Sequence, residues 1–119
     1  MGKEELGTPV QEVPAGSDLK EQIENLIGDS GVFLFMKGTP EMPQCGFSAN
    51  SVGILNEIKV PFKTFDILTN PDIRQGVKEY AQWPTYPQLY YKGQLVGGND
   101  IITEMFKSGE LQKVLQPEA

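Results

Sequence analysis

The chain has 119 residues, 39% of them hydrophobic and 9% aromatic, which is enough for one compact domain and too short for two. Its net charge of −6 argues against a general nucleic-acid-binding protein, which would carry a basic patch. No apolar run approaches the roughly 18 residues that span a bilayer, so the sequence predicts no membrane association through a transmembrane helix.

The chain contains one cysteine and no histidine. A single cysteine excludes a disulfide framework and fits a reducing compartment inside the cell. The absence of histidine removes the Cys-His and Ser-His pairs that activate nucleophiles, and it leaves too few ligands for an ordinary structural zinc site. Any helpers of Cys45 must therefore be backbone amides, lysine or arginine, or molecules from outside the chain.

The N-terminal half predicts a tail followed by a helix, a strand and a second helix. Residues 1–16 contain Gly, Pro and Glu without apolar periodicity, which indicates a flexible tail. Ser17 is expected to cap the first helix, whose apolar residues recur at helical spacing. The run VFLFM (32–36) predicts a strand buried on both faces. A long polar loop then leads to Cys45 and a second helix that ends before Pro61.

The C-terminal half predicts a strand, a helix and a hairpin. Residues 62–67 alternate as a strand does, and Asn70 and Pro71 suit the N-cap and first position of a third helix. The segments 87–91 and 94–97 flank a Lys-Gly turn and are expected to pair as a β-hairpin.

A last helix is expected after the hairpin, capped by Asn99 or Asp100, with a further helical turn beyond it. The order of elements is then α-β-α-β-α-β-β-α. A parallel βαβ unit followed by a hairpin predicts an α/β fold in which a central four-stranded mixed sheet has helices on both faces.

Cys45 invites two interpretations. A free cysteine is often a small buried hydrophobic residue without chemistry of its own. However, Cys45 follows a loop with two prolines and directly precedes a helix, whose N-terminal N–H groups and dipole stabilise a thiolate. Lys37, at the end of the preceding strand, is expected to lower the pKa of the thiol further. Ser48 stands where a second thiol of a C-x-x-C pair would be, so no internal disulfide can form.

Two later motifs complete the pattern. In WPTYPQLY (83–90), Pro87 suits the start of a strand, and a cis Tyr86–Pro87 bond would leave the Tyr86 N–H and C=O able to pair with an extended peptide; the alternative is a plain loop before an edge strand. In GGND (97–100), two glycines before a helix allow close backbone approach, and a helix N-terminus suits a carboxylate. Taken alone, this motif is also an ordinary turn.

Together, KGTPEMPQCGFS, WPTYPQ and GGND resemble the three signatures of the monothiol (CGFS-type) glutaredoxins, in the order and spacing of that family, over roughly residues 18–116. The resemblance implies a thioredoxin-like fold, with a glutaredoxin domain over 17–119 after the tail. It also implies a glutathione site with Cys45 as the reactive thiolate and metal ligand. The residues expected in this site are Lys37, Cys45, Phe47, Arg74, Thr85, Tyr86, Pro87, Gly98, Asn99 and Asp100.

The resemblance implies a role for each part of the site. Lys37 and Arg74 would hold the glycine carboxylate of glutathione, the Tyr86 backbone its cysteinyl unit, and Asn99 with Asp100 its γ-glutamyl end. For residues nearby, two roles are open for Lys78, a helper in the site or, as the favoured expectation, a residue on a solvated helix face; Trp83 is expected to pack beside the site. The chain departs from many relatives at Asn99, where they carry a second cysteine, so a redox cycle here would need an external thiol.

Two functions remain open at the level of sequence. A [2Fe–2S] cluster takes four thiolates, and two copies of this chain with two glutathiones would supply them. The resemblance implies such a cluster-bridged homodimer, monomeric without the cluster, that passes the cluster to acceptor proteins; a BolA-like protein is a further candidate partner. The alternative is a glutathione-dependent monothiol oxidoreductase that removes glutathione from protein mixed disulfides. Cytoplasm and organelle matrix (mitochondrion or plastid) are not distinguished.

Overall fold

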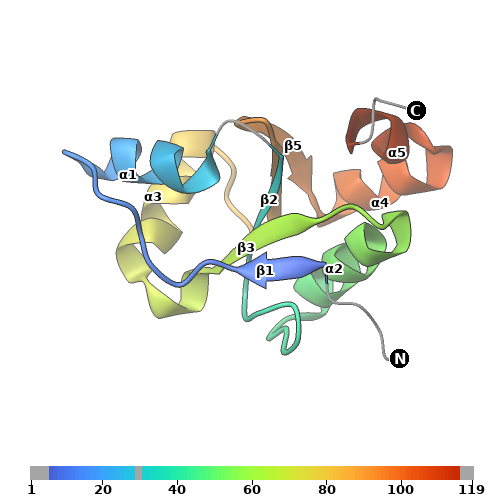
Figure 1. Ribbon diagram of the computed structural model, residues 1–119, viewed down its shortest axis with the longest axis horizontal. Coiled ribbons are helices and arrows are strands. Elements are labelled where there is room, and N and C mark those ends of the chain that lie inside the picture. Colours follow the sequence, from blue (N-terminus) through green and yellow to red (C-terminus); the bar gives the residue numbers. More distant parts are fainter. Residues whose placement is uncertain (1–5, 29–30, 116–119) are drawn as a thin grey trace.

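The structure is a computed structural model that describes residues 6–28 and 31–115 of the chain. A mixed β-sheet lies between two layers of helices (Figure 1). Its strands are β1 (Gly7–Pro9), β2 (Val32–Met36), β3 (Phe62–Asp66), β4 (Gln88–Tyr91) and β5 (Gln94–Gly98). The helices are α1 (Leu19–Ile27), α2 (Gly46–Ile58), α3 (Pro71–Ala81), α4 (Asn99–Ser108) and α5 (Glu110–Leu115), with a short 3₁₀ turn, η1 (Ile67–Thr69), before α3.

The strand order is β1-β3-β2-β4-β5. Strands β1, β3 and β2 run parallel, whereas β4 is antiparallel to β2 and β5 is antiparallel to β4. This topology confirms the predicted α/β, thioredoxin-like architecture of a mixed sheet with helices on both faces.

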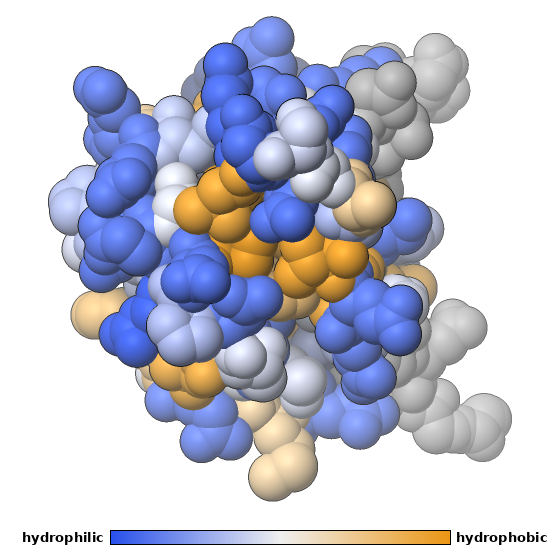
Figure 2. Space-filling view, turned by 90° about the vertical axis from the view of Figure 1, so that its left-hand side faces the viewer, coloured by the Kyte–Doolittle hydropathy of each residue, from blue (hydrophilic) through white to orange (hydrophobic). Residues whose placement is uncertain are grey.

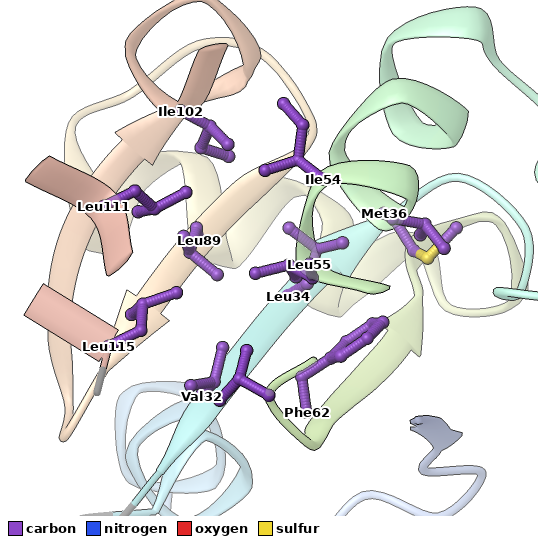
Figure 3. Close-up of a cluster of buried hydrophobic side chains, with 12 residues drawn as sticks. Val32, Leu34, Met36, Ile54, Leu55, Phe62, Leu89, Ile102, Leu111 and Leu115 are labelled. Atoms are coloured by element: carbon purple, nitrogen blue, oxygen red, sulfur yellow. The ribbon is translucent and has the colours of Figure 1, made fainter. Parts of the chain in front are cut away.

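Strand β2 supplies alternate side chains to two separate cores. Val32, Leu34 and Met36 lie in one cluster with side chains of α2, α4 and α5, as Figure 3 shows. Phe33 and Phe35 lie in the second cluster, against α1 and α3. All five residues of β2 are buried, which confirms the prediction of a strand covered on both faces.

The second cluster is rich in aromatic rings. Phe35 packs edge-on against Tyr90 and Phe65, with ring centroids 5.7 Å and 6.4 Å apart. The face of the molecule over α1 and α3 carries a small apolar patch among hydrophilic residues (Figure 2). Partly buried Val10 and Val13 also pack against this cluster, so the segment before α1 helps to cover it.

The predicted four strands are one too few, because residues 7–9, which were assigned to the flexible tail, form β1. The Val10 N–H donates to the Thr64 carbonyl (2.7 Å), and the Phe62 N–H donates to the Leu6 carbonyl (3.1 Å). The segment has no alternating apolar pattern, so only this pairing with the edge of β3 makes it a strand. The boundary at residue 17 between tail and domain stays a prediction.

Two predicted helix caps are also wrong by one residue. Asp18, not Ser17, caps α1, since its carboxylate accepts from the Glu21 N–H (2.9 Å). Gly98 is the N-cap of α4 and, as a glycine, has no side chain to offer a hydrogen bond. The Asn99 side chain contacts α2 instead, where its oxygen accepts from the Ser51 hydroxyl. The predicted cap of α3 is confirmed, with Asn70 accepting from the Ile73 N–H and Pro71 in the first turn.

Candidate functional site

The end of β2, the start of β4 and the end of β5 meet at one edge of the sheet. Phe35 pairs with Gln88, which in turn pairs with Gly98 on the other side of β4. The loop leading to Cys45, the segment before β4 and the N-terminus of α4 therefore come together. A pocket of about 450 Å³ lies between them. Its walls are formed by Lys37, Cys45, Phe47, Arg74, Lys78, Trp83, Pro84, Thr85, Tyr86, Gly98, Asn99, Asp100 and Ile101.

The loop between β2 and α2 is closed by its own backbone. Thr39 and Met42 exchange two N–H···O hydrogen bonds (3.3 Å and 3.0 Å), and the Gln44 N–H donates to the Lys37 carbonyl (2.8 Å). Gly38 adopts a φ of 93°, and a Cβ there would lie 2.5 Å from the Met42 carbonyl oxygen. Only glycine fits this position, which explains the glycine in KGTPEMPQ.

Two neighbouring strands hold the same loop from outside. The Asp66 carboxylate, at the end of β3, accepts from the Gly38 N–H at 2.9 Å. Gly7 of β1 lies against Pro40 so closely that an added Cβ would come within 2.9 Å of the proline ring. The loop that precedes Cys45 is therefore held by β1 and β3 as well as by its own turn.

Cys45 is half-buried at the N-cap position of α2, with the extended backbone of a cap residue. The sulfur makes no capping hydrogen bond, but nearby groups lower the pKa of the Cys45 thiol. The Ser48 backbone N–H contributes most, followed by the Phe47 N–H, the positive charge of Lys37 and the Ser48 hydroxyl, while partial burial acts in the opposite direction. The helix terminus and Lys37 thus favour the thiolate, as the sequence predicted.

Ser48 is fully buried and cannot act as a second reactive group from the surface. Its hydroxyl accepts from the Lys37 N–H (3.1 Å) and so joins the end of β2 to the first turn of α2. Ser48, the fourth residue of CGFS, therefore links the strand end to the helix beside Cys45 and also lowers the pKa of the Cys45 thiol.

The segment before β4 presents an unpaired piece of backbone to the pocket. The Tyr86–Pro87 bond is cis, as the sequence suggested. Within the part of the chain that the structure describes, the backbone N–H and C=O of Tyr86 make no hydrogen bond. The Tyr86 hydroxyl donates to the Arg74 carbonyl (2.7 Å), which ties this segment to α3. The Tyr86 backbone is thus held in place and available to an extended ligand.

Three cations and one carboxylate face the pocket. Lys37 follows β2, Arg74 and Lys78 belong to α3, and Asp100 lies in the first turn of α4. None of the four has an ion-pair partner among residues 6–28 and 31–115. Unpaired charges around a pocket are suited to an anionic ligand that also carries a positive group.

The pocket brings together all the predicted glutathione residues except Pro87, which is buried. Their contacts with a ligand remain predictions. Trp83 lines the pocket as expected. Lys78 does not lie on a merely solvated face, because it is half-buried and lines the pocket one turn after Arg74. The i, i+4 spacing of these two cations on one helix is the signal that could have placed Lys78.

Within residues 6–28 and 31–115, no three His, Cys, Asp or Glu side chains lie close enough together to hold a metal ion. None of the helices in this part of the chain is long and apolar enough to cross a membrane.

Comparison with known proteins agrees with this geometry. Residues 32–96 match the family model described as Glutaredoxin. The chain is 58% identical to monothiol glutaredoxin-S11 of rice (Oryza sativa subsp. japonica) over 81% of its own length, but it spans only 20% of that longer protein. It is 52% identical to a ycf64-like monothiol glutaredoxin of Synechocystis over 83% of its length and 92% of the relative's.

A solved structure shows the same fold. Reduced apo GrxS14 of poplar, determined in solution, superimposes with a TM-score of 0.73 at 48% identity, covering 83% of this chain and 91% of the other. The chain therefore belongs to the glutaredoxin family, among its monothiol members.

Proposed function

We propose that this chain binds glutathione in the pocket beside Cys45 and that two copies carry a labile [2Fe–2S] cluster for delivery to acceptor proteins. The observation that carries the proposal is the chemistry of the site. One thiol with a lowered pKa stands at the wall of a pocket that holds three unpaired cations and one carboxylate.

The charges of the pocket fit glutathione as a ligand. Glutathione has a carboxylate at each end, an ammonium group beside one of them, and an extended peptide between. Lys37 and Arg74 are suited to the glycine carboxylate, and Lys78 lies close enough along α3 to join them. Asp100 is suited to the ammonium group, and the unpaired Tyr86 backbone to the cysteinyl unit.

The supply of sulfur ligands fits a cluster shared between copies. One chain has a single cysteine and no histidine, so it cannot ligate a cluster alone. Two Cys45 thiolates and two glutathione thiolates complete a set of four. Half of these ligands are exchangeable small molecules, which supports a cargo that is handed on. A BolA-like protein is a further candidate partner, in a mixed dimer where it would supply a histidine ligand that this chain lacks.

The test is anaerobic reconstitution with iron, sulfide and glutathione, followed by visible absorption and size-exclusion chromatography. We expect a brown dimer that forms only with glutathione and that becomes a colourless monomer when the cluster is lost. Cys45→Ser should give a folded, colourless monomer, because a serine oxygen is a poor ligand for this iron. A chromophore retained in Cys45→Ser would refute the assignment of Cys45 as ligand.

A second function is supported by the lowered pKa of Cys45. The thiolate can attack the glutathione sulfur of a protein mixed disulfide, which releases the protein thiolate and leaves Cys45 joined to glutathione. A second glutathione thiolate then attacks that disulfide, which gives oxidised glutathione and restores the Cys45 thiolate. A colourless monomer throughout the reconstitution, together with rapid deglutathionylation of a test peptide, would make this the leading function. Either activity needs a reducing compartment to keep the thiol free.

A further inference from the structure

The two peptide units on either side of the Lys37 Cα are held by three different segments of the chain. The Lys37 N–H donates to the Ser48 hydroxyl (3.1 Å), and the Lys37 carbonyl accepts from the Gln44 N–H (2.8 Å). The next N–H, that of Gly38, donates to the Asp66 carboxylate (2.9 Å). Two planar peptide units that meet at a Cα determine the direction of its side chain. These contacts therefore determine the direction in which the Lys37 side chain leaves the backbone at the wall of the pocket.

The peptide unit between Lys37 and Gly38 depends on its hydrogen bonds for its orientation. Gly38 has a φ of 93°, and glycine adopts positive and negative φ about equally well, so its own sterics do not prevent this plane from turning. Gly38 is buried, so its N–H would leave the Asp66 carboxylate without regaining water if the plane turned. The contact with Asp66 thus stabilises the present orientation of the plane.

Asp66 is itself oriented by the end of its strand. It is the last residue of β3 and pairs with Met36, the last residue of β2, which places it beside the loop. The carboxylate oxygen that accepts from Gly38 also accepts from the Leu68 N–H (2.9 Å), in a turn that holds the side chain against its own backbone. Asp66 is not one of the described residues that line the pocket. It can therefore act on a ligand there only through the residues that it holds.

On the basis of the proposed glutathione binding, we infer that Asp66 is a positioning residue for Lys37, and that through the 37–38 peptide it directs the Lys37 ammonium group at the glycine carboxylate of glutathione. The role depends on the place of an acceptor oxygen and not on the charge of the carboxylate. Two substitutions separate these properties. Asp66→Asn keeps an oxygen at the same distance from the backbone and removes the charge, whereas Asp66→Glu keeps the charge and moves the oxygens by one methylene.

Two ligands measure the effect at one end of glutathione. Glutathione carries the glycine carboxylate, and γ-glutamyl-cysteinyl-glycinamide has the same chain without that charge. Calorimetry gives the affinity of the full chain for each ligand, and the ratio of the two affinities is the preference for the carboxylate. Lys37→Gln should lower this preference about tenfold, the usual effect of losing a hydrogen bond to a charged group.

The Asp66 variants are compared with that value. Asp66→Ala and Asp66→Glu should lower the preference about fivefold, whereas Asp66→Asn should change it less than about twofold. In the Lys37→Gln background, Asp66→Ala should have no further effect on the preference, because the two residues act as one unit. The comparison of Asp66→Asn with Asp66→Glu tests the inference even if Asp66→Ala does not fold.

Thr69→Val is the matched control. It removes the hydrogen bond from the Thr69 hydroxyl to the Asp66 carbonyl (2.8 Å), in the same turn but away from the loop, and it should leave both affinities unchanged. An equal loss of preference in Asp66→Asn and Asp66→Ala would show that the charge matters, and would overturn the inference. Equal losses for both ligands in Asp66→Glu, the result of a general loosening of the site, would also overturn it. Both results leave the proposed function intact, whereas failure of the wild type to bind glutathione would overturn both.

Discussion

Gln88 holds the segment that presents the Tyr86 backbone, and its replacement by leucine gives a quantitative test of the site. The side chain is fully buried at the start of β4. Its amide nitrogen donates to the carbonyls of Trp83 (3.2 Å) and Thr85 (3.1 Å), and its oxygen accepts from the Tyr90 hydroxyl (3.1 Å). One amide thus links the pocket wall to the aromatic core.

The expected loss follows from the three hydrogen bonds. Gln88→Leu keeps a similar volume but removes every partner of the amide. The Tyr90 hydroxyl is buried, so leaving it unpaired costs about 1–3 kcal/mol, whereas the carbonyls of half-buried Trp83 and exposed Thr85 regain water and cost about 0.5–1.5 kcal/mol each. We therefore expect the free energy of unfolding to fall by about 3 kcal/mol.

Chemical denaturation measures this loss, and calorimetry with glutathione measures its effect on the site. The matched control is Tyr90→Phe, which removes only the hydroxyl and leaves both bonds to the pocket segment. It leaves the buried Gln88 oxygen without the Tyr90 hydroxyl and should lower the free energy of unfolding by about 1–3 kcal/mol, less than Gln88→Leu, and leave glutathione binding unchanged. Gln88→Leu should weaken glutathione binding about tenfold, because the Tyr86 backbone is then less firmly placed.

Two results would refute this reasoning. If Gln88→Leu is no less stable than Tyr90→Phe, the amide does not hold the segment. If Gln88→Leu is less stable but binds glutathione as tightly as the wild type, the segment does not depend on Gln88 for its binding conformation.

The remaining predictions concern the thiol and the loop before it. The pKa of the Cys45 thiol is lowered in the folded chain. The free energy of unfolding should therefore rise with pH from the folded pKa up to the ordinary thiol value of about 8.5, and this contribution should be lost as the pH falls through the folded pKa. Cys45→Ser, unfolded at the same pH values, should lack the rise. Lys37→Gln should raise the thiol pKa in an ultraviolet titration of the thiolate, but only slightly, because the larger contribution of the Ser48 N–H remains. Gly7→Val should lower the free energy of unfolding by about 1–3 kcal/mol, since its Cβ would press on the Phe62 ring of β3 and on the Pro40 ring of the loop, and an unchanged denaturation midpoint would show that β1 is not packed closely against these two rings.

Much of the fold was predictable because its signals are local. The run 32–36, the Asn70-Pro71 helix start and the hairpin around residues 88–98 each carry their pattern within a few residues. The same is true of Cys45, which lies at the N-terminus of a helix as predicted. Strand β1 was missed because its residues become a strand only through pairing with β3, more than fifty positions away in sequence.

In the site, too, the sequence predicted where residues lie but not how their side chains are oriented. Motifs located the residues around the pocket, since strand ends and helix starts determine where a residue lies. They did not show that Gln88 donates to two carbonyls of the segment before β4, or that Asn50 and Ser51 donate to the Asn99 side-chain oxygen. A side-chain amide accepts at its oxygen and donates from its nitrogen, so its orientation depends on which partners the fold brings to each end. Polar side chains that connect distant elements therefore determine how the groups around this pocket are held, and a motif read from the sequence does not show those connections.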